Sequence, residues 1–275
     1  MTETAASPDL LATIVAAARR IVDVRRESLP EGALEERLER GRKPDGAAFV
    51  RALRSGPSPR VVAECKRRSP SRGILRADYR PAEHASAYAS AGAAAISVLT
   101  EPTFFDGSLH HLQQVRAAVT TPILRKDFIV DRYQMLEAAV AGADAILLIV
   151  GALDAASVWK LLAEARLLGL AALVEVHDAE QLRIAADAGA EVIGVNSRNL
   201  RTLGVEPELH DRLAPEMPTG AISVAESGLR EFADLRRLEG FGYHAFLVGE
   251  RLIVQDDPGA ALAALRGASG RRSIR

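Results

Sequence analysis

Short apolar segments recur along the chain, separated by stretches in which apolar residues keep helical spacing. Eight such segments lie at residues 60–66, 94–100, 122–127, 144–150, 171–176, 191–196, 221–227 and 245–250. Their length and their content of β-branched residues are typical of buried strands. The stretches between them, such as DAASVWKLLAEARLL (154–168), open with an Asp that can cap a helix. The pattern predicts eight strand–helix units in series.

The junctions between helix and strand repeat as well. Five of the predicted strands are preceded by a glycine, namely Gly92, Gly142, Gly169, Gly189 and Gly242. A glycine just after a helix commonly adopts a left-handed conformation and starts a short connection to the next strand. These glycines therefore predict helix ends.

Eight units with nearly continuous apolar strands predict a parallel sheet that is covered by helices. An open, doubly wound sheet usually carries a glycine-rich fingerprint after its first strand, and the corresponding loop here, KRRSPSRGIL (66–75), lacks it. Eight units match a closed (β/α)₈ TIM barrel. We therefore expect an α/β barrel over residues 60–268. Residues 1–59 should form an N-terminal helical extension that caps it, and residues 269–275 a frayed tail.

Composition limits the possible functions. The apolar share of 48% and the charged share of 26% are those of an ordinary globular protein. A net charge of −1 and an aromatic share of 4% argue against a nucleic-acid or membrane partner. Cys65 is the sole cysteine, so an intramolecular disulfide is impossible and a cysteine metal site is not expected. The segment MTETAASPDL lacks the pattern of a signal peptide, and we expect a cytoplasmic protein.

Ionisable and amide side chains stand at the ends of several predicted strands. In a (β/α)₈ barrel the chemistry takes place at the carboxyl ends of the strands, where alternate side chains face the interior. The residues concerned are Glu64, Lys66, Lys126, Glu175, Asn196 and Glu226, followed by Ser227, Gly228 and Gly249. One charged residue at a strand end is usually a surface residue. Charges that converge from several strands are costly to bury unless they pair, so this cluster favours acid–base catalysis.

Lys126 is unusual in a chain that prefers arginine. Of 35 basic residues, only Lys43, Lys66, Lys126 and Lys160 are lysines. An ammonium can release a proton when its pKa shifts, whereas a guanidinium cannot. The lysine at the end of the third strand is therefore predicted to transfer a proton.

The loops after the last two strands predict an anion site. TIM barrels often hold a phosphate there, through backbone N–H groups. Gly228 and Gly249 occupy these loops, where the backbone has to approach a ligand closely. The SPSRG segment (69–73) after the first strand is either an ordinary turn or a lid above the same end of the barrel.

Seven motifs together carry a family resemblance. They are AECKRRSPSRG (63–73), SVLTEPTFFDGS (97–108), PILRKDFIVDRYQ (122–134), DAILLIV (144–150), LVEVHD (173–178), IGVNSRNL (193–200) and VAESGL (224–229). In this order they resemble the indole-3-glycerol phosphate synthases of tryptophan biosynthesis, from about residue 5 to about residue 265. Fold analogy alone does not fix function, but here the residues of the site match as well.

The resemblance implies a carboxy-lyase that needs no metal and no cofactor. Its substrate would be a phosphorylated small molecule, the aminodeoxyribulose phosphate of anthranilate, which undergoes ring closure, decarboxylation and dehydration. Lys126 would protonate the substrate carbonyl during ring closure. Glu175 and Lys66 would carry out the dehydration, and Glu64 would orient Lys66.

The resemblance also implies the binding residues. Asn196, Arg198 and Ser227 would contact the substrate, and Glu226 would complete the polar wall. Ser69, Gly228 and Gly249, with Lys66 nearby, would surround the phosphate. We expect a monomer, to which other enzymes of the tryptophan pathway could bind.

Two positions depart from the family pattern. Cys65 replaces an aliphatic residue and should face the helices, between Glu64 and Lys66, which face inward. Glu250 stands where some members have a serine that contacts phosphate, and because an acid beside a phosphate is unfavourable, we leave it out of the site.

Three other functions fit parts of this pattern. A Schiff-base aldolase would use Lys126 as a nucleophile instead of an acid. A phosphoribosylanthranilate isomerase would need a cysteine and an aspartate at strand ends, but Cys65 is predicted to lie within a strand and to face outward. A barrel that only binds a ligand would not require five clustered ionisable groups.

Overall fold

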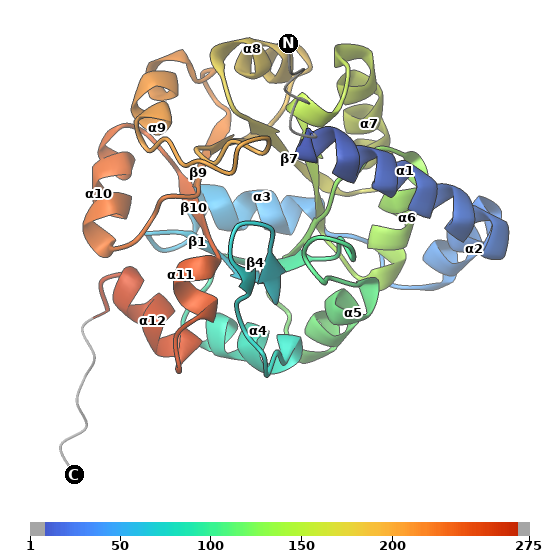
Figure 1. The fold of residues 1–275 in the computed structure, drawn as a ribbon, viewed down its shortest axis with the longest axis horizontal. Helices are drawn as coiled ribbons and strands as arrows, with labels where there is room; N and C mark the ends of the chain where they lie inside the picture. Colours follow the sequence, from blue (N-terminus) through green and yellow to red (C-terminus); the bar gives the residue numbers. More distant parts are fainter. Residues whose placement is uncertain (1–8, 269–275) are drawn as a thin grey trace, which may run out of the picture.

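A closed barrel of eight parallel strands forms the centre of the molecule (Figure 1). The structure, a computed structural model, describes residues 9–268, so the predicted tail at residues 269–275 lies outside the described residues. The barrel strands are β1 (Val61–Cys65), β4 (Ala95–Leu99), β5 (Ile123–Lys126), β6 (Ala145–Ile149), β7 (Ala171–Val176), β8 (Val192–Asn196), β9 (Ile222–Glu226) and β10 (Ala245–Val248). Each lies within one of the eight predicted segments.

The barrel closes because β1 pairs with both β10 and β4. Val61 is in register with Phe246 on one side, and Val62 with Ala95 on the other. The predicted fold class, a (β/α)₈ barrel with an N-terminal helical extension, is thereby confirmed.

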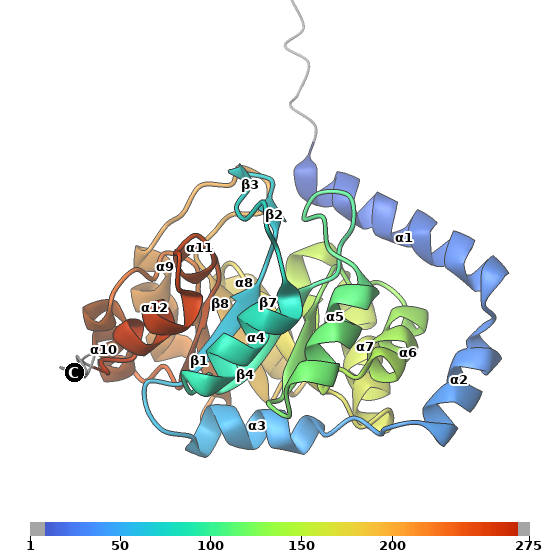
Figure 2. The ribbon, with the colours of Figure 1, turned by 90° about the horizontal axis from the view of Figure 1, so that it is seen from below.

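Helices surround the barrel and also precede it (Figures 1 and 2). Those before the first strand are α1 (Leu10–Ser28), α2 (Glu31–Arg40) and α3 (Gly46–Ser55). Those after it are α4 (Pro81–Ser90), α5 (Leu109–Ala118), α6 (Arg132–Ala141), α7 (Ala155–Leu167), α8 (Ala179–Asp187), α9 (Glu208–Leu213), α10 (Phe232–Gly240), α11 (Glu250–Ile253) and α12 (Pro258–Leu265). Within the described range, none of these helices combines the length and the apolar character that a membrane span requires.

The predicted helix signals are present. The side chains of Asp154 and Asp178 cap α7 and α8 by accepting hydrogen bonds from backbone N–H groups three residues further along the chain. All five predicted junction glycines have positive φ, with Gly142 at 99° as the most extreme. A residue with a side chain would be strained there, so these glycines end the helices as expected.

Two separate apolar cores follow from the alternation of side chains along the strands. One lies between the strands and the outer helices and includes Val61, Ala63 and Cys65. The other fills the barrel interior and includes Val62, Leu124 and Leu147. Cys65 is fully buried on the helix side, as predicted from its position between Glu64 and Lys66.

Helix α3 covers the amino-terminal end of the barrel, opposite the hairpin of β2 (Arg68–Ser69) and β3 (Gly73–Ile74) in Figure 2. Phe49 and Leu53 of α3 are fully buried and belong to the interior core. The Gly46 N–H also donates a hydrogen bond to the carbonyl of Gly169, at 3.0 Å. The helix therefore closes one end of the barrel, and the strand carboxyl ends remain accessible at the other.

A buried carboxylate fixes the chain near this closed end. Asp144, which is 1% exposed, forms ion pairs with Arg42 and Arg116. It also accepts hydrogen bonds from the backbone N–H groups of Asp45 and Ile123, both at 3.0 Å. One side chain thus joins the segment before α3 to β5 and to α5.

We expect the Asp144→Ala variant to lose ~3 kcal/mol of unfolding free energy, since two guanidinium groups and two N–H groups lose a common buried acceptor. Urea unfolding curves would measure the loss. The matched control is Asp187→Ala, at an exposed aspartate at the end of α8, which should unfold like the wild type. Equal stability of all three proteins would contradict this role of Asp144.

Candidate active site

A cavity of about 480 Å³ lies at the carboxyl ends of the barrel strands. It is lined by all of the predicted site residues, namely Glu64, Lys66, Ser69, Lys126, Glu175, Asn196, Arg198, Glu226, Ser227, Gly228 and Gly249. Four of them are at the ends of β5, β7, β8 and β9, Glu64 is in β1, Ser69 is in the short β2, and the others lie in the loops after β1, β8, β9 and β10. The fold thus brings into one cavity residues that are far apart in the sequence, as expected for the functional end of such a barrel.

Lys126 lies between two buried carboxylates. Its Nζ is 3.1 Å from Oε2 of Glu175 and 2.8 Å from Oε2 of Glu226. Both glutamates are 1% exposed, and the lysine side chain is 14% exposed. A single cation therefore forms ion pairs with two glutamates that have little access to water.

The three groups shift one another's proton affinities. Burial lowers the pKa of Lys126, but the charges of Glu175 and Glu226 outweigh this effect and raise it above its usual value. Burial raises the pKa of Glu226 to about 8, because Lys126 only partly opposes burial and the charge of Glu175 adds to it. The pKa of Glu175 is lowered in spite of its burial, chiefly by Lys126. Near neutral pH the cluster therefore holds an ammonium, a carboxylate and a neutral acid.

Glu64 and Lys66 form a second pair from the carboxyl end of β1. Lys66 Nζ is 2.7 Å from Glu64 Oε1, in ion-pair contact but without the angles of a good hydrogen bond. Gly249 lies directly beside this carboxylate, because a Cβ built there would overlap Glu64 Oε1 and be 2.8 Å from its Cδ. Gly249 thus has a second effect that the sequence did not predict, which is to leave room for Glu64.

Asn196 organises the loops after β8 and β9. Its Oδ1 accepts hydrogen bonds from the Ser227 hydroxyl at 2.8 Å and from the Arg198 N–H at 3.0 Å. Ser227 and Gly228 have φ values of 66° and 74°, so the chain turns sharply there. A non-glycine residue such as Ser227 is uncommon in this conformation and is typical of functional sites.

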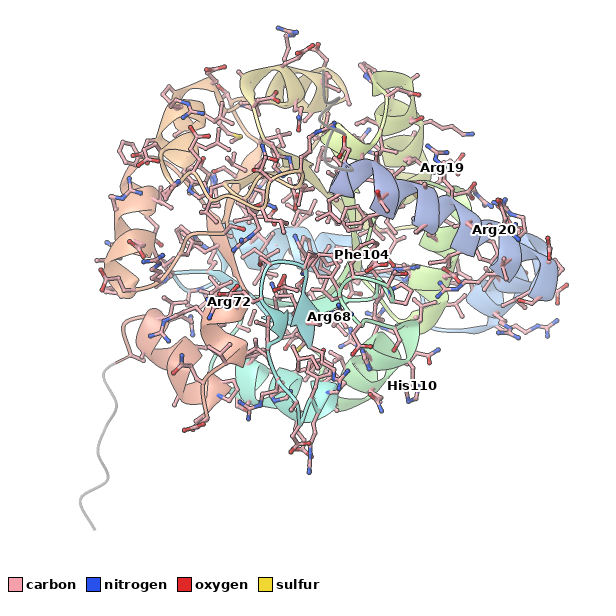
Figure 3. All side chains as sticks on the ribbon, viewed as in Figure 1. Arg19, Arg20, Arg68, Arg72, Phe104 and His110 are labelled. Atoms are coloured by element: carbon pink, nitrogen blue, oxygen red, sulfur yellow. The ribbon has the colours of Figure 1, made fainter. Side chains whose placement is uncertain are left out.

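The hairpin after β1 covers part of the opening. From the sequence, this segment could be either an ordinary turn or a lid. In the structure it forms two short strands, β2 and β3. Arg72 of the hairpin, labelled in Figure 3, donates a hydrogen bond to Glu250 at 2.9 Å. Arg198 approaches the same carboxylate at 4.0 Å. Glu250 therefore lines the cavity together with Gly228 and Gly249, and its carboxylate forms ion pairs with two arginines.

Part of the cavity lining is apolar and was not predicted. Phe105 and Phe128 form part of it, with ring centroids 6.2 Å apart, and Leu147 and Leu200 also contribute. The buried Glu101 accepts hydrogen bonds from the N–H groups of residues 103, 104 and 105, and so fixes the loop that carries Phe105. The two adjacent phenylalanines of the TFFD segment could have indicated this apolar lining, because the chain has few aromatic residues.

Arg125, the neighbour of Lys126, points in the opposite direction. It is fully buried between β5 and α6 and donates hydrogen bonds to Thr100 and Asp127, at 3.0 and 2.9 Å. Glu137 of α6 also binds Arg125, at 3.3 Å, and binds Arg25 of α1, at 3.2 Å. The strand that carries Lys126 is thus anchored on its outer side to the N-terminal extension.

His177 lies close to the site but does not line the cavity. Its Nε2 is 3.4 Å from Oε1 of Glu175. Among residues 9–268 no group of three His, Cys, Asp or Glu side chains is arranged to hold a metal ion.

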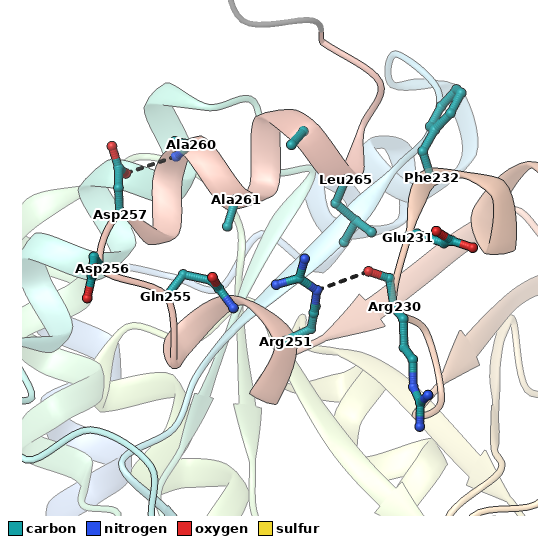
Figure 4. A pocket seen from close by; sticks show the side chains of 11 residues that line it. Arg230, Glu231, Phe232, Arg251, Gln255, Asp256, Asp257, Ala260, Ala261 and Leu265 are labelled. Carbon is teal, nitrogen blue, oxygen red and sulfur yellow. Dashed lines mark hydrogen bonds between the residues drawn. The ribbon is translucent and has the colours of Figure 1, made fainter.

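A second hollow, of about 410 Å³, lies on the outer surface between the start of α10 and helices α11 and α12 (Figure 4). It contains none of the predicted site residues. Its acidic groups include Glu231 and Asp257, which cap α10 and α12. The hollow is therefore explained by ordinary helix ends, and the barrel cavity remains the candidate site.

The family profile described as indole-3-glycerol phosphate synthase matches residues 11–265. The chain belongs to this family. Indole-3-glycerol phosphate synthase 2 of Streptomyces coelicolor is 48% identical over 258 residues, which are 94% of this chain and 99% of the relative. The indole-3-glycerol phosphate synthase of a Nocardioides species is 54% identical over 207 residues, which are 75% of this chain and 80% of the relative. These matches confirm the family and the carboxy-lyase class that the sequence motifs predicted.

Among solved structures, a 3-hexulose-6-phosphate synthase superposes with a TM-score of 0.59. It covers 77% of this chain and 100% of its own, at 16% sequence identity. At such low identity, the similarity supports the barrel fold alone.

The raised pKa of Glu226 predicts a pH-dependent stability. An unfolded glutamate has a pKa of about 4.3, whereas Glu226 in the folded protein has a pKa of about 8. Its contribution to stability is therefore fully present below about pH 4.3 and is lost as the pH rises through about 8. In the Glu226→Gln variant, the unfolding free energy should decline less between pH 5.5 and 8.5 than in the wild type, as measured by urea unfolding.

The exposed Glu216 provides the control, and Glu216→Gln should retain the pH dependence of the wild type. The same decline in the wild type and in Glu226→Gln would mean that Glu226 does not titrate in this range.

Proposed function

We propose that the chain converts 1-(2-carboxyphenylamino)-1-deoxyribulose 5-phosphate into indole-3-glycerol phosphate, carbon dioxide and water. The observation that carries this proposal is the ammonium of Lys126, held at 3.1 and 2.8 Å from the buried carboxylates of Glu175 and Glu226. The cavity around it has both polar and apolar lining residues, and the substrate has a phosphorylated polar chain and an aromatic ring. Family membership supports the same reaction.

Lys126 is the general acid of ring closure in this proposal. As the carboxylate-bearing ring carbon attacks the ketone, the carbonyl oxygen gains electrons and takes a proton from the ammonium. Release of carbon dioxide from that ring carbon then restores the aromatic ring. The raised pKa keeps Lys126 protonated before the substrate arrives, so the proton that this step needs is present.

Glu175 and Lys66 carry out the dehydration. The hydroxyl formed in the first step leaves as water, which requires a proton at its oxygen and the loss of a proton from the adjacent carbon. Glu175 is ionised because of its lowered pKa, so it is suited to accept a proton. Lys66, held by Glu64 at 2.7 Å, can supply one.

The remaining residues bind and orient the substrate. The aromatic ring lies against Phe105 and Phe128, since an apolar wall favours its burial. Asn196, Arg198 and Ser227 contact the carboxylate and the hydroxyl groups, and Glu226 completes the polar wall.

The phosphate lies near Ser69, Gly228 and Gly249, within reach of Lys66. Glu250 has to turn away from this region when a phosphate binds, because two anions would repel each other. The proposal includes no metal and no cofactor. The protein would act as a cytoplasmic monomer, with residues 1–59 as a cap on the barrel domain at 60–268, and could associate with other tryptophan-pathway enzymes.

The charge of Lys126 argues against a Schiff-base aldolase. Attack on a carbonyl requires a neutral amine, whereas two carboxylates raise the pKa of Lys126. Borohydride added with the substrate should therefore trap no adduct. The isomerase reaction would need a thiol in the cavity, and Cys65 is fully buried on the helix side of β1.

The direct test mixes the purified protein with the proposed substrate in the presence of a chelator and follows indole fluorescence. Fluorescence that grows with time and with protein concentration supports the synthase reaction without a metal. Tight binding of the compound without any product would contradict the proposal and would favour a barrel that only binds its ligand.

Lys126→Met should lower turnover by about 10³-fold or more, because the variant has no acid to protonate the carbonyl. Substrate binding, measured by calorimetry, should largely persist. Lys160→Met is the matched control, since Lys160 is an exposed lysine on α7 and should not affect turnover. Normal turnover in Lys126→Met would refute the assignment of the acid.

A further inference from the structure

Gly194 occupies a crowded position in the barrel interior. It lies on β8, two residues before Asn196, and is in register with Glu175 on one side and Val224 on the other. A Cβ built on Gly194 would overlap Oε1 of Glu226 and would be 3.3 Å from its Cδ. The carboxylate of Glu226 therefore fills the space that any other residue at position 194 would use.

The position of Glu226 explains this contact. Glu226 is on β9 and is in register with Asn196, so its backbone lies nearer the mouth than Gly194 does. Its side chain thus bends back toward the barrel floor instead of extending into the open cavity. In this conformation Oε2 accepts a hydrogen bond from Lys126 at 2.8 Å, and Oε1 is buried.

The backbone of Gly194 does not itself require a glycine. Its φ is not among the positive values, which occur at nine other glycines of the described range. A residue with a side chain could adopt this strand conformation, so the space taken by Glu226 is the constraint. The nearest apolar atom is Leu173 Cδ1, at 3.1 Å from the built Cβ, and packing against Leu173 is the competing explanation.

We propose that Gly194 is a positioning residue for the reaction, because its missing side chain lets Glu226 bend inward and hold Lys126 together with Glu175. The inference rests on the proposed function, since it assigns to Lys126 the role of the acid. It adds a residue that makes no bond to the substrate and acts only through Glu226.

The first experiment compares Gly194→Ala with the wild type in the indole fluorescence assay. A displacement of about 1 Å in a catalytic group can cost ~10²-fold in rate, so we expect kcat to fall ~10- to 100-fold, with a smaller change in KM. Gly240→Ala is the matched control: Gly240 ends α10 without a positive φ, and a Cβ there would meet nothing within 4 Å. Gly240→Ala should keep the wild-type kcat.

Turnover by the wild type in the same assay distinguishes a failure of the proposed function from a failure of the positioning role of Gly194. Absence of wild-type turnover would refute the proposed function, whereas wild-type turnover with an unchanged Gly194→Ala would refute only the positioning role.

A second readout does not depend on turnover. In Gly194→Ala the carboxylate of Glu226 should be pushed toward the open cavity, where better hydration lowers its pKa. Carbon-13 NMR titration of labelled glutamate side chains, with Glu226→Gln to assign the signal, would measure the shift. An unchanged titration of Glu226 in Gly194→Ala would overturn the proposal.

Stability distinguishes Glu226 from Leu173 as the group that needs the space. If Gly194→Ala is destabilised or fails to fold, the Gly194→Ala/Glu226→Ala double variant should regain a melting temperature close to that of Glu226→Ala alone. Equal destabilisation by Gly194→Ala in both backgrounds would assign the effect to Leu173 and would contradict the inference.

Discussion

The arrangement of the site depends on one ammonium shared by two carboxylates. Burying two glutamates beside each other is unfavourable, since their charges repel and neither can be hydrated. Lys126 makes the arrangement possible by lying within 3.1 Å of both. It can compensate only one of the two charges, so the other acid retains its proton near neutral pH. The site thus contains a neutral acid, a carboxylate and an ammonium because it has one positive charge for two acidic groups.

Most of the fold could be predicted because its signals are local. Strand length, helical spacing and junction glycines such as Gly142 each depend on a few neighbouring residues, and eight repetitions of one unit leave few possible topologies. The inward direction of Lys126 followed from the same alternation that turns Cys65 toward the helices. Side chains that gather at one end of a parallel barrel can therefore be identified before any distance is known.

The details of the cavity depend on contacts between distant segments, and the sequence did not predict them. No local pattern indicates that Gly249 adjoins Glu64 or that Gly194 adjoins Glu226, because each pair is joined only across neighbouring strands. Likewise, Glu250 was left out of the site on electrostatic grounds, yet its carboxylate faces the cavity because Arg72 and Arg198 come from two other loops. In both cases the missing information is the packing geometry.

Helix α3 closes one end of the barrel in the part of the chain that the structure describes. Phe49 and Leu53 close the amino-terminal end, and the interior above them is filled by residues such as Leu124 and Leu147. A reaction at the opposite end has no rear exit, so carbon dioxide, water and the larger product all have to leave by the route through which the substrate entered. All products therefore have to leave past the β2–β3 hairpin before the next substrate can bind. Release of the small products and of the large product thus depends on the same opening.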